Sequence, residues 1–401
     1  MPKHKTEANN IAPPNKFKPL AICVMTRAIP AHGGGGMEQV IWRLASAWAE
    51  LGHSIDIFTT ELRAGTSLDN PHPDKIRVIP LPGPPAKYSH EWFRATRSIP
   101  FTNYDIVFSV STAARHVVDL CKESGIPVVM QAHGTSLDEI ITKLKLGTIR
   151  GLATVPKNIL ALFHNFYDFP RFSCVVAISW SVEASLASYP KFSQPRMVVV
   201  IPNGVERKAP PPQRTPSGLY KISFVGRLHR EKGVDLLLRE AVGLNTMISI
   251  AGEGPAASEL KKLATKLYPE GKVSFMGKLS PDEVGALFVE SDLVVLPSRR
   301  REGLPLVALE ALNAGAPIIV SPGVARGFPP HDMPLGVSVT ALKPGNLRKA
   351  ILEEMASKKA DKVISLPPMF ELNSVTAEYI SLFNKLIEGS TPTTPGNQHE
   401  K

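Results

Sequence analysis

Short runs of β-branched and other apolar residues alternate along the chain with longer segments whose apolar residues recur at helical spacing. The short runs are typical of strands buried in parallel sheets, and the longer segments are typical of crossover helices. The expected strands are Leu20–Met25, Ser54–Thr59, Ile76–Pro80, Ile106–Val110, Val128–Gln131, Val175–Ile178, Val198–Pro202, Lys221–Val225, Met247–Ala251, Val273–Met276, Leu293–Leu296 and Ile318–Val320. The pattern predicts an α/β fold of two doubly wound Rossmann-like domains that face each other across a cleft.

A proline-rich break at 209–216 separates the two sets of strands and is typical of an extended linker. A chain of 401 residues is also too long for one ordinary core. The expected division is a disordered N-terminal segment at 1–18, a first domain at 19–207, a linker at 208–218, a second domain at 219–368, a C-terminal helix at 369–388 and a disordered tail at 389–401.

Composition indicates a soluble globular enzyme, because 43% of the residues are hydrophobic and 20% are charged. No apolar run is long enough to cross a bilayer, and the polar, basic start of the chain is unlike a secretory signal. Cys23, Cys121 and Cys174 are odd in number and widely spaced, which suggests neither a disulfide framework nor a zinc site. We therefore expect a cytoplasmic protein.

The net charge of +10 directs attention to anionic partners. In Lys143–Arg171, basic residues are interleaved with Leu, Ile, Phe and Tyr, and Asp168 is the one acidic residue of that stretch. The segment can rest on an anionic membrane surface, which would make the protein peripheral, or it can form a helix with a solvated basic face. No nucleic-acid recognition motif is present, so nucleic acid is not an expected partner.

The carboxylates of Glu302 and Glu310 are eight positions apart, with glycine and proline just after the first. If a helix starts after Pro305, its free N–H groups and positive dipole end can hold an anion. Glu310 then lies about one turn inside the helix, where it can reach neutral hydroxyls. Phosphate at the helix start and ribose at the carboxylate together make a nucleotide-sugar site, although an isolated pair of this kind is more often two surface glutamates.

Cations follow the first strand of the second domain. That strand ends at Gly226, Arg227 stands at its exit, and Lys232 precedes the next helix, an order that suits a diphosphate. Gly252 and Gly254 close the following strand and can pass under a nucleobase, or simply form a turn. The arginine run 299–301 can strengthen anion attraction or be solvated.

Three features of the first domain are candidates for the facing half of the site. Gly33–Gly36 can approach a phosphate or sugar closely, or form a loop without a ligand. His133 ends a predicted strand, where it can bond a sugar hydroxyl or be a satisfied core histidine. Asn203 belongs to an Asn-Gly turn. No Asp-x-Asp motif is present to bridge a metal to a diphosphate, so we expect neither a metal nor another cofactor.

Together these motifs resemble the retaining glycosyltransferases of family 4 (glycosyl transferases group 1), which have the GT-B fold. The resemblance extends from about Leu20 to Ile387 and is most specific between 221 and 320. It implies that 19–207 is an acceptor-side domain, that 219–368 binds the nucleotide sugar, and that the helix at 369–388 crosses back to the first domain.

The resemblance also implies roles for individual residues. It implies catalytic roles for His133, Arg227, Lys232 and Glu302. Donor binding falls to Gly34, Gly35, Gly226, Gly252, Gly254, Gly303, Leu304, Pro305, Leu306, Val307 and Glu310, and acceptor or interdomain contacts fall to Gly36 and Asn203. The chain departs from the family at 321–327, where paired glycines are common, and at Leu372, where an aromatic residue is usual.

The resulting hypothesis is transfer of a hexose from a nucleoside-diphosphate sugar to a hydroxyl of a saccharide or lipid-linked acceptor, with retention of configuration. Such a reaction belongs to polysaccharide or glycolipid biosynthesis. No residue is an obvious covalent nucleophile, so front-face substitution is expected. Two alternatives stay open: a nucleotide-sugar epimerase or hydrolase of the same architecture, and a non-catalytic nucleotide-sugar-binding protein.

Overall fold

A computed structural model describes residues 18–33, 35–63, 65–66, 70–146, 153–207, 218–357 and 364–390. Three expected segments lie wholly or almost wholly outside the described residues: the N-terminal segment at 1–18, the linker at 208–218 and the tail at 389–401. The candidate residue Gly34 also lies outside them.

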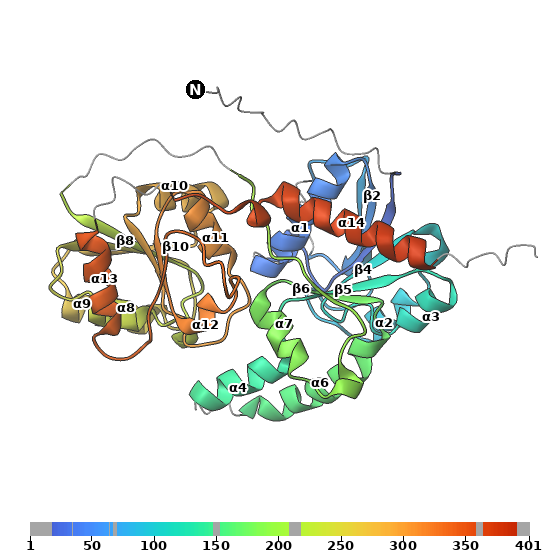
Figure 1. Ribbon diagram of the computed structural model, residues 1–401, viewed down its shortest axis with the longest axis horizontal. Coiled ribbons are helices and arrows are strands. Elements are labelled where there is room, and N and C mark those ends of the chain that lie inside the picture. The colour runs from blue at the N-terminus through green and yellow to red at the C-terminus, as the bar shows by residue number, and fades with distance from the viewer. Residues whose placement is uncertain are drawn as a thin grey trace, which may run out of the picture.

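The described strands form two parallel sheets, one of seven strands and one of six, in two domains that lie side by side (Figure 1). The first sheet has the order β3 (Ile76–Leu81), β2 (Ser54–Thr60), β1 (Ala21–Met25), β4 (Ile106–Val110), β5 (Val128–Ala132), β6 (Cys174–Ala177) and β7 (Val198–Val200). The second has the order β10 (Val273–Gly277), β9 (Thr246–Ala251), β8 (Tyr220–Val225), β11 (Leu293–Leu296), β12 (Ile318–Val320) and β13 (Val337–Val339).

Helices connect the strands in each domain. Those of the first domain are α1 (Gly36–Glu50), α2 (His90–Thr96), α3 (Val118–Glu123), α4 (Ser136–Leu146), α6 (Val155–Asp168) and α7 (Trp180–Ala187). Those of the second are α8 (Val234–Glu240), α9 (Ala257–Leu267), α10 (Pro281–Glu290), α11 (Leu306–Asn313), α12 (Pro322–Ala325) and α13 (Asn346–Ala356). Short 3-10 turns are η1 (Pro30–His32), η2 (Phe101–Asn103), η3 (Phe169–Arg171), η4 (Lys191–Ser193), η5 (Arg230–Lys232) and η7 (Pro368–Phe370).

Both faces of each sheet are buried, which explains why the strands have near-continuous apolar sequences. In β1, Ile22 and Val24 belong to one buried cluster of the first domain, and Cys23 and Met25 belong to the cluster on the opposite face. The second sheet is likewise covered on both faces. The prediction of two doubly wound α/β domains is therefore confirmed, and the twelve expected strands are present with ends within two residues of the expected ones.

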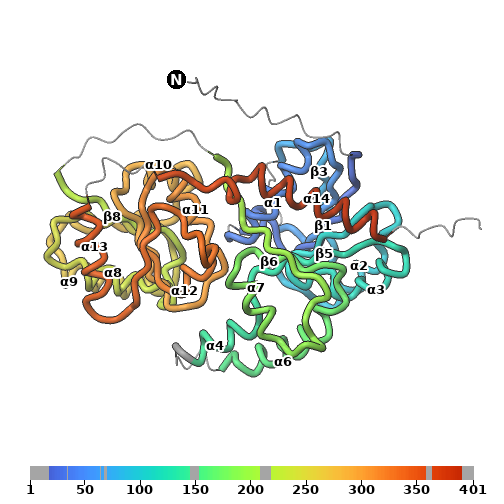
Figure 2. Tube along the Cα trace, in the orientation of Figure 1, coloured from blue at the N-terminus to red at the C-terminus, as the bar shows by residue number. Residues whose placement is uncertain are grey.

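The last helix, α14 (Leu372–Ser390), leaves the second domain and packs on α1 of the first (Figures 1 and 2). Two crossings of the chain meet where it starts, because Val205 N donates to Phe370 O at 3.0 Å and Leu372 N donates to Val205 O at 2.9 Å. A side chain at Gly204 would come within 3.0 Å of Leu372 Cα, so this approach requires glycine. Among the described residues, no helix has both the length and the apolarity needed to cross a bilayer.

Candidate functional site

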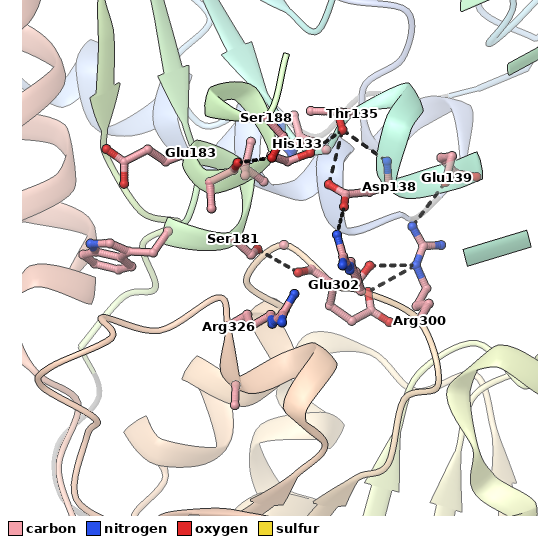
Figure 3. A pocket seen from close by; sticks show the side chains of 18 of the residues that line it. His133, Thr135, Asp138, Glu139, Ser181, Glu183, Ser188, Arg300, Glu302 and Arg326 are labelled. Carbon is pink, nitrogen blue, oxygen red and sulfur yellow. Dashed lines mark hydrogen bonds and ion pairs between the residues drawn. The ribbon is translucent and has the colours of Figure 1, made fainter. Parts of the chain in front are cut away.

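The two domains meet where the segments that follow β5, β6 and β7 face the segment that follows β11. Ser181 of α7 donates a hydrogen bond to the Glu302 carbonyl at 2.9 Å, and Asn203 Nδ2 donates to the Leu304 carbonyl at 3.0 Å. A Cβ on Gly303 would lie 3.3 Å from the His133 carbonyl. Asn203 thus lies at the contact between the domains, and His133 and Glu302 lie on facing sides of one pocket (Figure 3).

Glu302 is the centre of a charged cluster within the second domain. Lys232 Nζ lies 2.7 Å from Glu302 Oε1, Ser298 Oγ donates to the same oxygen at 2.8 Å, and Arg300 Nε is 3.8 Å from Oε2. Burial opposes charge on this carboxyl, but Lys232 and Arg300 outweigh it and hold the pKa of Glu302 below its ordinary value. Glu302 is therefore a carboxylate near neutral pH and can accept hydrogen bonds there but cannot donate a proton.

Lys232 is placed by a tight backbone turn. Residue 233, which ends η5 and precedes α8, has φ of +72°, and a Cβ there would lie 2.0 Å from the Pro297 carbonyl oxygen. Only glycine fits this left-handed position against the backbone that leads from β11 to Ser298. The Lys-Gly pair in the sequence therefore has a steric reason, since Gly233 lets the lysine turn come close to the Glu302 loop.

Arg227 follows β8, as expected, and its side chain is exposed. In the part of the chain that the structure describes, the Arg227 guanidinium has no hydrogen-bond or ion-pair partner, in contrast to Lys232. Gly252 and Gly254 lie beside it, and a Cβ on each would lie 1.9 Å from Gly226 O and 2.3 Å from Leu228 O, respectively. Close packing of the loops after β8 and β9 thus accounts for both glycines without a nucleobase.

The helix expected after Pro305 is present, since α11 begins at Leu306 with Pro305 at its N-cap. The first-turn amides of Leu306 and Val307 have no acceptor within a helix of this kind. Glu310 lies one turn further on, and its Oε1 accepts a hydrogen bond from Arg43 Nη2 of α1 at 3.0 Å. The second glutamate of the motif is therefore paired across the domains, with a residue 267 positions away that no local pattern connects to it.

The glycine loop of the first domain leads directly into a helix. Gly33 has φ of +129°, Gly35 is the N-cap of α1, and Gly36 is its first residue. The start of α1 thus lies at the carboxyl edge of the sheet, where β5 also ends. In this arrangement it can approach an anion or a sugar.

His133 belongs to a buried relay that reaches α14. Its Nε2 lies 2.8 Å from Gln131 Oε1, and Gln131 Nε2 donates to the Tyr379 hydroxyl at 2.9 Å. Burial lowers the pKa of His133 to about 4, so the ring is neutral near pH 7. With the proton on Nε2 toward Gln131, Nδ1 carries the lone pair and can accept a hydrogen bond from a sugar hydroxyl.

This histidine should make stability depend on pH. Its pKa is lower in the folded protein than the usual 6.5, so below that value the unfolded chain takes up a proton that the folded chain does not. Stability is therefore lost as the pH falls from 6.5 toward 4. In urea unfolding, the drop in unfolding free energy between neutral pH and pH ~5 should be about 1–2 kcal/mol larger in wild type than in His133→Gln. Equal drops would show that His133 is protonated as readily folded as unfolded.

A pocket of about 1100 Å³ lies between the domains (Figure 3). His133 and Glu302 line it together, while Arg227, Lys232 and Glu310 are not among its lining residues. Its walls come largely from segments to which the sequence analysis assigned no site residue: α4, α7, α12 with the residues after it up to Pro330, and Asn158 of α6. The first-domain wall carries hydroxyl and amide groups, from Thr135, Ser136, Asn158, Ser181, Ser185 and Ser188.

The arginine run 299–301 is partly buried and forms ion pairs, an arrangement that the sequence analysis did not anticipate. Each guanidinium is paired with carboxylates: Arg299 with Asp235 at 2.7 Å, Arg300 with Glu139 at 3.2 Å and Glu231 at 3.1 Å, and Arg301 with Asp138 at 3.1 Å. Because Asp138 and Glu139 belong to α4 of the first domain, the run holds the two domains together at the edge of the pocket (Figure 3).

Two facing α/β domains, each built on a parallel sheet, have the architecture of the GT-B class. Comparison with known proteins agrees: residues 34–208 match the model of Glycosyltransferase Family 4, and residues 205–329 match that of Glycosyl transferases group 1. The chain belongs to the group 1 glycosyltransferases of the GT-B fold.

Individual relatives are distant and of uneven coverage. A D-inositol 3-phosphate glycosyltransferase of Pseudarthrobacter chlorophenolicus is 27% identical over 73% of this chain and 75% of its own. An uncharacterized glycosyltransferase of Methanocaldococcus jannaschii is 38% identical, but over only 25% of this chain and 26% of its own.

Solved structures share the fold at low identity. Sucrose-phosphate synthase from Thermosynechococcus elongatus superposes with a TM-score of 0.76 at 18% identity and covers 92% of this chain and 100% of its own. Anabaena HepE in complex with UDP and glucose superposes with a TM-score of 0.65 at 16% identity and covers 94% of this chain and 100% of its own. At such identities the likeness is one of fold.

Proposed function

We propose that the protein transfers a hexose from a nucleoside-diphosphate sugar to an acceptor hydroxyl with retention of configuration. The observation that carries the proposal is the meeting of Lys232, Glu302 and the start of α11 at one edge of the second sheet, opposite His133 of the first domain. The complex of HepE with UDP and glucose, a protein of the same fold, supports this class of donor.

Positively charged groups and carboxylates have different roles in this proposal. Departure of the nucleoside diphosphate builds negative charge, which Arg227, Lys232 and the amides of Leu306 and Val307 stabilise. The carboxylate of Glu310 accepts hydrogen bonds from the ribose, in place of or beside Arg43. Arg227, Lys232 and the helix amides supply the positive charge that a metal would otherwise bring, so we propose a reaction without a metal or other cofactor.

The sugar lies between the domains. His133, neutral and accepting through Nδ1, holds a hydroxyl of the transferred hexose, and the Glu302 carboxylate faces it from the second domain. In front-face substitution, the bond from the anomeric carbon to the phosphate breaks while the acceptor oxygen bonds to the same face of that carbon. The departing phosphate takes the acceptor proton, and configuration is retained. The polar wall of the pocket suits a saccharide acceptor, as in polysaccharide or glycolipid biosynthesis on the cytoplasmic side of a membrane.

Calorimetric titration with UDP, GDP and ADP, each with and without an attached hexose, tests the donor site directly. One nucleotide should bind selectively, and Glu310→Ala should weaken it about 10- to 100-fold, because a hydrogen bond to a charged group contributes about 1.5–3 kcal/mol. The matched control is Glu290→Ala at the end of α10, an exposed glutamate paired with Lys221 on the surface of the same domain.

The outcomes separate the alternatives. Selective binding together with transfer to an acceptor supports the proposal. Conversion of the donor without any acceptor would instead identify an epimerase or hydrolase, and binding without conversion by any extract would identify a binding protein. Absence of binding to every nucleotide by folded protein would contradict the donor site altogether.

A further inference from the structure

An exposed apolar stripe runs along α6. Leu160 is 60% exposed, Phe163 62% and Tyr167 64%, and their spacing of three and four places them on one helix face. Phe192 of η4 is 76% exposed and lies beside this stripe, since its ring is 6.1 Å from that of Phe166. Large aromatic side chains gathered on one exposed face favour an apolar partner.

Two lysines border the stripe, and the exposed Asp119 near its Tyr167 end is neutralised by Arg171, whose guanidinium lies 4.8 Å from the centre of the Tyr167 ring. Lys157 lies on the exposed side of α6 next to Leu160, and Lys191 precedes Phe192. The one acidic residue of α6, Asp168, is 1% exposed and is paired with Arg115 at 3.1 Å. An apolar centre with a basic border is the charge pattern that fits an anionic lipid surface, into which Phe and Leu insert while Lys contacts headgroups.

The same helix forms a wall of the catalytic pocket. Asn158 lines the pocket that holds His133 and Glu302, and its neighbours Lys157 and Ile159 are exposed. Helices α4 and α6 pack on each other along one edge of the first domain (Figures 1 and 2). A surface that docks through α6 therefore brings a membrane within one helix width of the pocket.

We propose that the exposed face of α6, together with Lys191 and Phe192 of η4, docks on an anionic lipid bilayer. The acceptor is then a lipid-linked saccharide presented at that surface, a conclusion about substrate class that rests on the proposed function. Docking itself needs neither donor nor acceptor, so it can be tested separately.

Flotation of the full-length protein with vesicles measures the docking. Wild type should float with vesicles of phosphatidylcholine and phosphatidylglycerol in equal parts and much less with phosphatidylcholine alone. Leu160→Ser/Phe163→Ser should lower vesicle partition roughly 30-fold through lost apolar insertion. Lys157→Glu/Lys191→Glu should remove the preference for phosphatidylglycerol.

Matched controls are available on the second domain. Leu335→Ser/Leu352→Ser replaces side chains that are 52% and 44% exposed, and Lys262→Glu/Lys266→Glu makes the same change of charge on α9. Both should float like wild type, and all four double variants should keep wild-type nucleotide affinity, which distinguishes failed docking from a failed donor site.

Three results would overturn the proposal. Wild type could remain unbound with both kinds of vesicle, or the α6 variants could float as well as wild type. Light scattering could also show a wild-type dimer that Leu160→Ser/Phe163→Ser converts to a monomer, which would assign the face to a second copy of the chain.

Discussion

Replacing both clamp cations, as Arg227→Ala/Lys232→Ala, should lower kcat/KM by about two to four orders of magnitude, because each charge-assisted hydrogen bond to the departing diphosphate contributes about 1.5–3 kcal/mol. The two single variants should differ in which interactions they lose. Arg227 is exposed and available, so its loss removes only the contact with the donor. Lys232 also neutralises Glu302 at 2.7 Å, so its loss leaves that buried carboxylate to Ser298 and Arg300 alone.

A nearby arginine makes the control exact in residue type. Arg230 lies in the same turn as Lys232, but its side chain is 68% exposed and pairs with Glu259 at 2.9 Å on the surface. Arg230→Ala should therefore leave kcat/KM within about twofold of wild type, as expected for an exposed ion pair. Steady-state kinetics that found near-normal turnover in the clamp double variant, or an equal loss in Arg230→Ala, would contradict the assignment.

The strands could be predicted closely from sequence because parallel strands buried on both faces are written as continuous apolar runs. The strand that was missed, β13 (Val337–Val339), lies at the edge of the second sheet and is partly exposed, so its three residues carry little apolar signal. At the end of β7 the expected strand ran on to Pro202, but the ladder stops at Val200. A proline cannot donate to the next ladder position.

The second-domain half of the site was also accessible from sequence, since its groups follow strands and precede helices in a fixed local order. Contacts between domains were not accessible. Arg43 and Glu310 are separated by 267 positions, and Arg300 and Glu139 by 161, so nothing local couples them. The pocket wall from α7 was missed for the same reason, because its serines are recognisable as part of the site only once the fold places them beside Glu302.

Truncating Phe383 should destabilise the protein by about 3–5 kcal/mol, a large part of the usual total. Phe383 is fully buried in α14, with its ring 5.4 Å from Trp48 of α1 and 6.0 Å from Phe108 of β4. The Phe383→Ala cavity therefore opens where α14 docks on the first domain. Urea unfolding measures the loss, and Lys385→Ala on the exposed side of the same helix should change the unfolding free energy by less than about 0.5 kcal/mol.

Nucleotide binding and turnover, measured separately in this variant, then test what α14 does. Arg227, Lys232 and Glu310 all come from the second domain. At temperatures below its unfolding midpoint, Phe383→Ala should therefore bind nucleotide as wild type does. Turnover should fall, because α14 also carries Tyr379, which holds Gln131 and through it His133. Tyr379→Phe, which removes one hydroxyl without a cavity, should cost only about 1–3 kcal/mol of stability yet lower turnover similarly. If both variants turned over normally, the relay would serve the core of the first domain and not the orientation of His133.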